Sequence, residues 1–432
     1  MDRREFLAST AATSLAAGTA LGTARQAAAA PHEGASGFTF PPEWHAHEAV
    51  WIGWTKGLFD EPDHVAMRLD MLAALTPHVP VTINIEDEAS AGRIRALMAE
   101  RKVPPGRVAF NIQDIVDLWV RDTGPLFVSN GQRLQIAGFT WGNYGFPWPW
   151  SSPRQLARGR APRQIAAARG YRLIPSEVIA EGGGIDVNSR SLVAYRDATL
   201  HRNPGRPLDQ IEREMKRLYG KDQVIWLDRA PITDRVFAGP KVGNFFGWGA
   251  NGHVDEYVRF VSEDTILLAE VDERERERDA LMRLDHEILT ENRRQLERAR
   301  DPDGKPFNVV TMPVPDVGPF LRRRTLTERD FTAAPGGFDA RSVYRDFKVG
   351  DEVIDVPAVS YCNFLVTNGV VVGARYGGEG RPDHLAESDA RSAAILKAHF
   401  PDREIVQIDP LPANWDGGGV HCLTQQQPAV PA

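Results

Sequence analysis

The sequence predicts an α/β fold, because strand-like segments alternate along the chain with amphipathic helical segments. Its 432 residues are 42% hydrophobic and 25% charged, a balance typical of globular proteins. No glycine-rich phosphate loop follows a strand and opens a helix, which disfavours a nucleotide-binding version of the fold. The pattern is compatible with one doubly wound sheet and with several small β-β-α-β units arranged in a ring.

Short apolar runs rich in β-branched residues mark the predicted strands. In chain order these runs are residues 50–54, 81–85, 108–112, 224–227, 265–271, 309–312 and 405–408. Two further strands, 364–366 and 370–372, flank Asn368-Gly369, and this dipeptide favours a tight hairpin turn.

Amphipathic patterns predict helices between these strands. Residues 208–218 place Ile211, Met215 and Leu218 on one face. Residues 272–300 combine an apolar stripe with many Glu and Arg residues, which indicates a helix whose outer face is solvated.

The first 30 residues have the pattern of an export signal and are set apart from the fold. Arg3 and Arg4 precede a weakly apolar run over residues 8–21, and Ala29 and Ala30 suit cleavage. The paired arginines are typical of a twin-arginine signal, although a general secretory signal or an uncleaved anchor has similar features. We therefore predict export by the twin-arginine pathway to the periplasm or the extracellular space.

The rest of the chain is predicted to be one domain. Residues 31–37 form a linker rich in Pro, Gly and Ser, and residues 38–432 form the domain. Residues 313–353, which contain three consecutive arginines and a Pro-Gly-Gly turn, resemble a long insertion in this domain and not a domain boundary.

Charge and cysteine content narrow the possible partners. The formal net charge of −7 excludes the concentrated basic surface of a nucleic-acid-binding protein and suits a small cationic substrate. No stretch after the signal approaches ~18 apolar residues, so no membrane association is expected after cleavage. The two cysteines, Cys362 and Cys422, are too few for a C-x-x-C zinc site, and we expect both to be free thiols. The sequence does not indicate an oligomeric state.

Two polar segments in the first half of the chain are candidates for a functional site. Residues 119–125, W-V-R-D-T-G-P, suit a strand end that opens into a pocket, and a structural Arg121–Asp122 pair is the alternative. Residues 181–188, E-G-G-G-I-D-V-N, contain three glycines that permit close backbone approach, and then alternate as a strand does. A glycine-rich turn capped by Glu181 is the alternative here.

Two more candidate segments lie in the second half. Residues 251–260, N-G-H-V-D-E-Y-V-R-F, would place His253 and Asp255 on one face of a strand, where a base and a carboxylate could act together. Residues 416–426, D-G-G-G-V-H-C-L-T-Q-Q, place Cys422 just after three glycines that would let a substrate approach the thiol. A small buried, inert cysteine is the alternative.

Together these residue types suit attack on a planar cation. Asp122 and Asp255 would hold guanidinium nitrogens by charge-assisted hydrogen bonds, and the bound cation would favour the thiolate of Cys422. The thiolate would attack the central carbon, while His253 would protonate the departing ammonia and then activate water to hydrolyse the S-linked intermediate. A peptidase would need oxyanion donors and fewer carboxylates around its thiol.

At the level of these motifs, the chain resembles the agmatine deiminase and bacterial-type peptidylarginine deiminase family of the pentein superfamily, whose members modify guanidino groups. The resemblance runs from Pro42-Glu43-Trp44 to Gln427. It rests on W-V-R-D-T-G-P, E-G-G-G-I-D-V-N, G-H-V-D, S-Y-C-N-F at residues 360–364 and G-G-G-V-H-C-L-T-Q-Q.

The resemblance implies a fivefold pseudosymmetric α/β propeller built from ββαβ units, with the active site at its centre. Matched positions imply Asp122 and Asp255 as guanidinium-binding carboxylates, His253 as general acid and base, and Cys422 as nucleophile. No metal or organic cofactor is implied. Three further residues in family motifs are expected to line or support the substrate pocket: Trp119, Glu181 and Asn363.

The resemblance implies hydrolysis of a guanidine C–N bond, and agmatine, giving N-carbamoylputrescine and ammonia, is the first substrate expected. The uncharged segment 245–251 departs from the acidic stretch that agmatine deiminases carry before G-H-V-D. Arginine in peptides, converted to citrulline, is therefore the second expectation. Amidino transfer to an amine and non-catalytic guanidinium binding are further alternatives.

Overall fold

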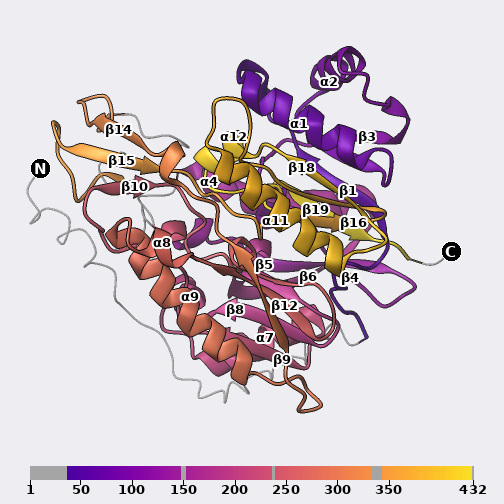
Figure 1. The fold of residues 1–432 in the computed structure, drawn as a ribbon. Coiled ribbons are helices and arrows are strands. Elements are labelled where there is room, and N and C mark those ends of the chain that lie inside the picture. The colour runs from indigo at the N-terminus through magenta and orange to yellow at the C-terminus, as the bar shows by residue number, and fades with distance from the viewer. Residues whose placement is uncertain (1–36, 147–151, 236–238, 333–342, 431–432) are drawn as a thin grey trace, which may run out of the picture. The chain divides into compact units, whose positions relative to one another are not determined.

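Five small sheets of the same design form most of the structure (Figure 1). The computed structural model describes residues 37–146, 152–235, 239–332 and 343–430, which belong to the structural unit of residues 35–432. The predicted export signal, residues 1–30, and all of the predicted linker except Gly37 lie outside the described residues. The α/β prediction is confirmed, and separate small sheets take the place of one doubly wound sheet.

Each of the five sheets joins an antiparallel pair of strands to a parallel partner. In the first sheet, β19 (Thr424–Pro428) is antiparallel to β1 (His47–Gly53), which is parallel to β2 (Val81–Ile85), and β3 (Val108–Ile112) extends the sheet. The other four sheets, each with its strands in spatial order, are β4 (Leu126–Ser129), β5 (Leu134–Thr140) and β6 (Arg172–Ile179); β7 (Ile185–Val187), β8 (Ser191–Tyr195) and β9 (Gln223–Leu227); β11 (Val258–Phe260), β12 (Thr265–Glu270) and β13 (Asn308–Pro313); and β16 (Leu365–Thr367), β17 (Val370–Ala374) and β18 (Glu404–Ile408).

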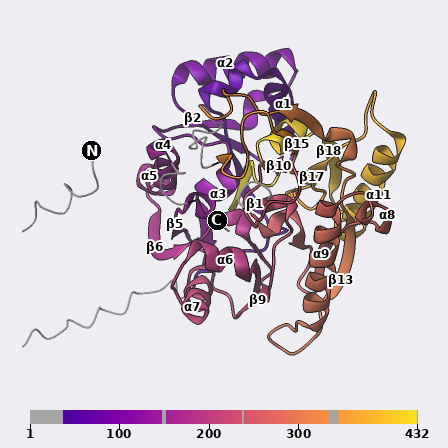
Figure 2. The same cartoon turned by 90° about the vertical axis from the view of Figure 1, so that its left-hand side faces the viewer.

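Helices make the crossovers that parallel strands require. Figure 2 shows helices α2, α5, α7, α9 and α11 around the outside of the strands. The crossover helices are α1 (Pro62–Leu75), α2 (Glu88–Glu100), α4 (Pro153–Ala157), α5 (Ala161–Arg169), α6 (Arg196–Arg202), α7 (Leu208–Tyr219), α8 (Glu273–Arg276), α9 (Ala280–Arg298) and α11 (Asp383–His399). Two short helices, α3 (Val120–Thr123) and α12 (Leu411–Trp415), lie between sheets.

Most predicted elements are confirmed. Every strand predicted from a short apolar run coincides with an observed strand to within a few residues, and the Asn368-Gly369 turn joins β16 to β17. The predicted helix at 272–300 is divided into α8 and α9, because the Asp279 side chain accepts a hydrogen bond from the backbone of Met282 and starts a new helix.

A sixth sheet lies outside the repeated design. Its central strand, β15 (Glu352–Val356), is parallel to β10 (Phe245–Gly247) and antiparallel to β14 (Arg322–Thr325). β14 belongs to the predicted insertion and β10 to the uncharged segment before G-H-V-D, so these two segments meet in one sheet. Residues 333–342 of the insertion lie outside the described residues.

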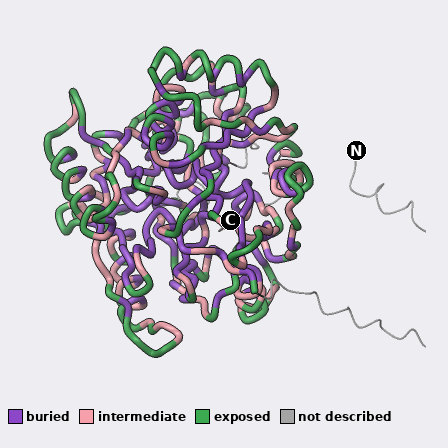
Figure 3. Tube along the Cα trace, turned by 90° about the vertical axis from the view of Figure 1, so that its right-hand side faces the viewer, coloured by how far each residue is buried: buried purple, intermediate pink, exposed green. Residues whose placement is uncertain are grey.

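The first strand of each repeated sheet is an inner strand. β4, β7, β11, β16 and β19 are buried along their whole length. In Figure 3 the buried parts of the chain lie inside, and the exposed residues lie mainly on helices and loops. A segment that leads directly into an inner strand therefore opens into the interior of the unit.

In the parts of the chain that the structure describes, every helix is too short or too polar to span a lipid bilayer.

Close packing at the end of β1 gives a test of the fold. A Cβ built on Gly53 lies 1.8 Å from the backbone oxygen of Asp117, so Gly53→Ala is expected to destabilise the protein by about 1–3 kcal/mol. Gly92, exposed in α2, has no heavy atom within 4 Å of such a Cβ, so Gly92→Ala is expected to add roughly 0.5–1 kcal/mol. Urea unfolding measures the free energy of unfolding of both variants. Equal stability of the two variants would contradict the close packing at Gly53.

Candidate active site

All five inner strands are preceded by a candidate residue of the site. Asp122 lies before β4, Glu181 before β7, His253 and Asp255 before β11, Asn363 before β16 and Cys422 before β19. Each of these side chains is buried, with at most 8% of its residue exposed. The repeated design therefore brings together residues from all five sheets.

Gly183 shows how closely three of these residues converge. A Cβ built on this glycine would lie 2.5 Å from His253 Nδ1, 3.0 Å from Asp255 Oδ2 and 3.1 Å from Asp122 Oδ1. The second glycine of E-G-G-G is thus required because any side chain there would collide with the site. Its backbone N–H donates to Asp122 Oδ1 at 3.0 Å.

Cys422 is held on a loop that Asn363 supports. Asn363 Nδ2 donates to Cys422 Sγ at 3.2 Å, and Asn363 Oδ1 accepts from the backbone N–H groups of His421 and Cys422 at 2.9 and 3.3 Å. A Cβ built on Gly418 would lie 3.1 Å from Sγ and 2.8 Å from Cζ3 of Trp119, so this glycine and the tryptophan ring both border the thiol. Burial raises the pKa of Cys422 well above its usual range, and the anionic Asp255, Glu256 and Asp122 raise it further.

His253 lies between two carboxylates. Its Nδ1 is 3.7 Å from Asp122 Oδ1, and its Nε2 is 3.6 Å from Glu181 Oε2. Burial disfavours the charged ring, but Asp122, Glu181 and Asp255 outweigh that effect and raise the pKa of His253 to about 9. The ring is therefore protonated at neutral pH.

The two carboxylates expected to bind guanidinium have different environments. Burial raises the pKa of Asp122 to about 6, and Tyr144 donates to its Oδ2 at 3.1 Å. Burial also acts to raise the pKa of Asp255, but His421 and His253 outweigh it, and the pKa of Asp255 is lowered. Asp255 Oδ1 is buried and has no hydrogen-bond partner among the described residues.

The side chain of Glu181 is held in place by an ion pair with Arg202. Its Oε2 accepts from Arg202 Nε at 2.5 Å, and Arg202 also donates to the backbone oxygens of Ala250 and Asn251. This pairing connects the E-G-G-G segment to the chain just before His253, so Glu181 faces the histidine from a fixed position.

The structure corrects two local predictions. His253 and Asp255 do not lie on a strand, because residues 254–256 form a 3₁₀ turn before β11. Asp234 accepts from the backbone N–H groups of Ala250, Gly252 and His253, which removes donors that a neighbouring strand would need. Similarly, the W-V-R-D segment forms α3 and is not a strand end.

Several buried residues around the site were not assigned roles from the sequence. Glu43 Oε2 lies 2.7 Å from His421 Nε2, and His421 Nδ1 lies 2.6 Å from Asp255 Oδ2. The His421 ring therefore links the carboxyl groups of Glu43 and Asp255. Glu43 also forms an ion pair with Arg259 at 3.1 Å. Glu43 and His421 stand inside family motifs, and this position in the motifs was the only signal in the sequence.

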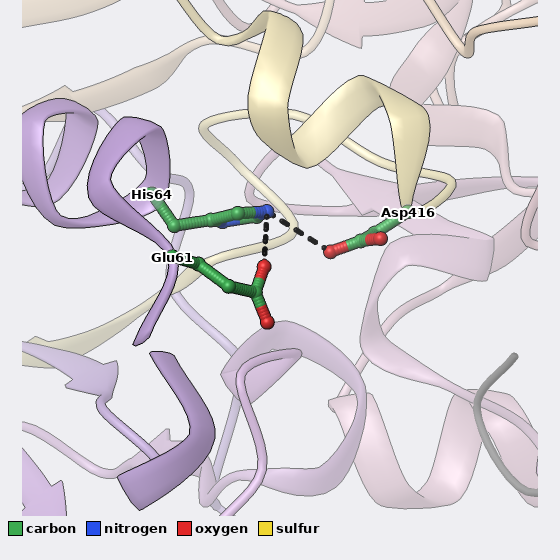
Figure 4. A group of neighbouring side chains, drawn as sticks. All are labelled: Glu61, His64 and Asp416. Atoms are coloured by element: carbon green, nitrogen blue, oxygen red, sulfur yellow. Dashed lines mark ion pairs between the residues drawn. The ribbon is translucent and has the colours of Figure 1, made fainter. Parts of the chain in front are cut away.

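The described residues contain two groups of potential metal ligands. In the first (Figure 4), His64 Nε2 lies 3.5 Å from Glu61 Oε2 and 3.2 Å from Asp416 Oδ2. Arg68 Nη1 lies 3.3 Å from His64 Nδ1 and can only donate, so Nε2 carries the proton that a metal ligand must lack. The group therefore acts as an anchor between α1 and the glycine loop that leads to Cys422.

The second group is Asp255, Glu256 and Cys422. A metal would need the thiolate and both carboxylates in ionised form. Burial and the neighbouring carboxylates instead raise the pKa of Cys422 well above its usual range, so the thiol keeps its proton. The donor chemistry therefore does not fit a resident metal ion, and it suits an organic cation that arrives with its own charge.

Comparison with known proteins agrees with these motifs. The chain matches the model of the Porphyromonas-type peptidyl-arginine deiminase family over residues 39–428. An agmatine deiminase from Pseudomonas putida is 30% identical over 415 residues, which cover 91% of this chain and 96% of that relative. A second, from Pseudomonas aeruginosa, is 29% identical over 413 residues, with the same coverage of 91% and 96%.

Solved structures share the fold. Agmatine deiminase of Enterococcus faecalis has a TM-score of 0.66 at 21% identity, with 92% of this chain and 97% of that chain covered. Agmatine deiminase of C. jejuni has a TM-score of 0.64 at 17% identity, with 91% and 97% covered. The family resemblance predicted from the sequence is confirmed, and this chain belongs to the Porphyromonas-type peptidyl-arginine deiminase family.

Proposed function

We propose that this protein hydrolyses the guanidine C–N bond of a linear guanidinium substrate. Agmatine or a close relative is the first candidate substrate. The observation that carries the proposal is the convergence of a thiol, a protonated histidine and two carboxylates in one buried site. The curated relatives that are 29–30% identical over 91% of this chain are named agmatine deiminases. The products from agmatine would be N-carbamoylputrescine and ammonia.

Binding would place the cation between Asp122 and Asp255. The buried Oδ1 of Asp255 has no hydrogen-bond partner among the described residues, so it is available to accept from a guanidinium N–H group. In the absence of substrate, burial and three acidic side chains hold Cys422 in its thiol form. A guanidinium beside Sγ offsets this negative charge and favours the thiolate.

The reaction would follow in two steps. Cys422 Sγ attacks the central carbon, and His253 gives its proton to the nitrogen that leaves as ammonia, which forms a thiouronium-type intermediate. Water then attacks the same carbon and His253 takes one of its protons. As the C–S bond breaks, the proton of the new hydroxyl group passes to the departing sulfur, which leaves the ureido product, the Cys422 thiol and a protonated His253. In this scheme Asn363 steadies the sulfur, Trp119 borders the pocket, and Glu181 holds His253 in position.

We propose also that the five repeated sheets close into a fivefold pseudosymmetric propeller of the pentein type. Contacts of β19 with β4 and of β7 with β11 support a ring of inner strands. The proposal includes one domain over residues 38–432, an insertion at about 313–353, and export directed by a twin-arginine signal in residues 1–30. The paired arginines of the sequence support the last of these.

Deimination of arginine in peptides is the second candidate, and a cavity on the sixth sheet favours it. The cavity has a volume of about 460 Å³, and Phe246, Trp248, Tyr344 and Trp415 contribute aromatic surface to it. It adjoins the nucleophile loop, because a Cβ built on Gly417 would lie 3.2 Å from the backbone carbon of Trp248.

The charges of this cavity suit a peptide better than a distal ammonium group. Its two carboxylates, Asp330 and Asp355, are both paired with Arg324, at 2.8 and 2.6 Å. Arg329 also lines the cavity and is exposed. Aromatic surface next to an exposed arginine would accept a peptide that carries acidic groups.

Substitution of the nucleophile tests the proposed reaction. Cys422→Ser is expected to abolish release of ammonia and ureido product while it retains binding of the guanidinium substrate, because Asp122 and Asp255 remain. Cys362→Ser is the matched control and should retain turnover, since Cys362 is a second buried free thiol outside the proposed machinery. Turnover by Cys422→Ser, or formation of an amidino-transfer product without ammonia, would reject the hydrolytic mechanism.

The pH dependence of kcat/KM tests the assigned protonation states. Activity is expected to rise as Asp122 ionises near pH 6, because the cation needs its carboxylate, and to fall near pH 9 as His253 loses its proton. Initial rates from about pH 5 to about pH 10 give the profile. A profile with no decline on the alkaline side would exclude His253 as the acid.

Charge reversal at the cavity separates the two substrate classes. Arg329→Glu is expected to lower kcat/KM for acidic arginine-containing peptides by roughly threefold to tenfold, and to leave kcat/KM for agmatine unchanged. Arg172→Glu, on the exposed start of β6, is the matched control and should change neither value. Equal kinetics of wild type and Arg329→Glu on every peptide would remove the support for peptide substrates.

A further inference from the structure

Glu256 is a buried carboxyl group in contact with the nucleophile that the reaction scheme above does not use. Its Oε1 lies 3.4 Å from Cys422 Sγ, closer than Asp255 Oδ2 at 3.7 Å. Only 2% of the residue is exposed. The adjoining 3₁₀ turn is fixed, because Ser360 Oγ donates to the backbone oxygen of Glu256 at 2.5 Å.

We propose that Glu256 is the base that accepts the proton of Cys422 when the guanidinium substrate binds; this inference rests on the proposed function. The S–H bond breaks, its electron pair stays on sulfur, and an O–H bond forms on Glu256. The pair carries one negative charge before and after the transfer. The neutral carboxyl group then donates a hydrogen bond to the thiolate, beside the one from Asn363 Nδ2.

The other groups near the thiol are poorly suited to this step. His253 is already protonated at neutral pH and is needed as the acid for ammonia. Asp255 Oδ2 accepts from His421 at 2.6 Å, and its lowered pKa makes it a weak base. Asn363 Oδ1 is occupied by two backbone N–H groups.

Glu256 has the properties that the step requires. Burial and the negative charges of Asp255 and Asp234 raise the pKa of Glu256 well above its usual range, so it is a stronger base than an ordinary carboxylate. In the free site Cys422 Sγ donates to Glu256 Oε1, so the sulfur is protonated and the single negative charge of the pair lies on the carboxylate. A cation held at the sulfur stabilises the charge there instead, which makes the transfer dependent on substrate.

The variant Glu256→Gln tests the proposal, because glutamine has the same shape and can still donate to sulfur but cannot take its proton. We expect kcat for the best guanidinium substrate to fall at least about a hundredfold near pH 7, with partial recovery at alkaline pH where solvent removes the thiol proton. Binding of the same substrate, measured in the Cys422→Ser background with and without Glu256→Gln, should be unchanged. Glu256→Asp should recover part of kcat.

A control variant and the activity of the wild type separate a failure of this inference from a failure of the proposed function. Asp285→Asn removes another buried carboxyl group, in α9, and should lower the melting temperature without changing the pH profile of kcat. Wild-type kcat and pH profile in Glu256→Gln would overturn the inference and leave the proposed function intact. Absence of turnover by the wild type on every guanidinium substrate would instead overturn the proposed function.

A measurement on the wild-type protein tests the role of Glu256 even if the Glu256→Gln variant does not fold. An unreactive guanidinium compound, added near pH 7.5, should raise thiolate absorbance without release of a proton to solvent, as calorimetry in buffers of different ionisation enthalpy reports. Release of one proton per thiolate formed would show that the proton leaves the site, and would overturn the role of Glu256.

Discussion

Buried negative charge is the constraint on which this structure depends. Acidic side chains gather around one thiol in a site that excludes solvent, and isolated charges in such a place are strongly destabilising. Arg202 compensates Glu181, while Arg259 and the His421 ring compensate Glu43. The carboxyl groups of Asp122 and Glu256, which lie close to the reacting groups and have raised pKa values, are compensated least. A guanidinium ion supplies the missing positive charge, so the arrangement selects its ligand by charge as well as by shape.

The same constraint explains why the whole chain contributes to the site. Glu43 enters from the segment before β1, and its partner His421 lies next to Cys422, before β19. β1 and β19 are antiparallel neighbours in one sheet, so the two ends of the domain are joined where the nucleophile is placed. Each further sheet adds its own residue just before its inner strand. Loss of one sheet would therefore leave both a gap in packing and an unpaired buried charge.

The sequence predicted the local features of this arrangement well. The strand at 370–372 was placed correctly because a buried strand is a continuous apolar run, and the hairpin after β16 follows from Asn368-Gly369. The seven predicted site residues lie together because glycine-rich and charged segments mark where the chain enters the interior. β14 was not predicted, since its residues, Arg322–Thr325, are polar and pair with only one neighbouring strand.

Contacts between residues that are far apart in the sequence could not be predicted from local sequence patterns. Glu43 and His421 are separated by 378 positions, and no periodicity joins them. Glu256 follows Asp255 directly, yet its contact with Cys422 appears only when the 3₁₀ turn is known. The strand predicted for His253 and Asp255 was wrong for a similar reason, because the acceptor that holds the turn is Asp234, many residues earlier.

The energetic cost of the site follows from the direction of its pKa shifts. Asp122 has a pKa of about 6, above its usual 3.8, so the folded protein holds this proton more tightly than the unfolded chain does. Its contribution to stability is therefore lost as pH rises from about 4 to about 6, and at neutral pH the ionised group costs roughly 3 kcal/mol. His253 acts in the opposite sense, since its pKa is raised from 6.5 to about 9. Its contribution to stability is full below about pH 6.5, is still largely present at neutral pH, and is lost progressively as the pH rises to about 9. The protonated histidine thus offsets part of the cost of the carboxylate beside it, and the remaining excess of negative charge is what a cationic substrate can relieve.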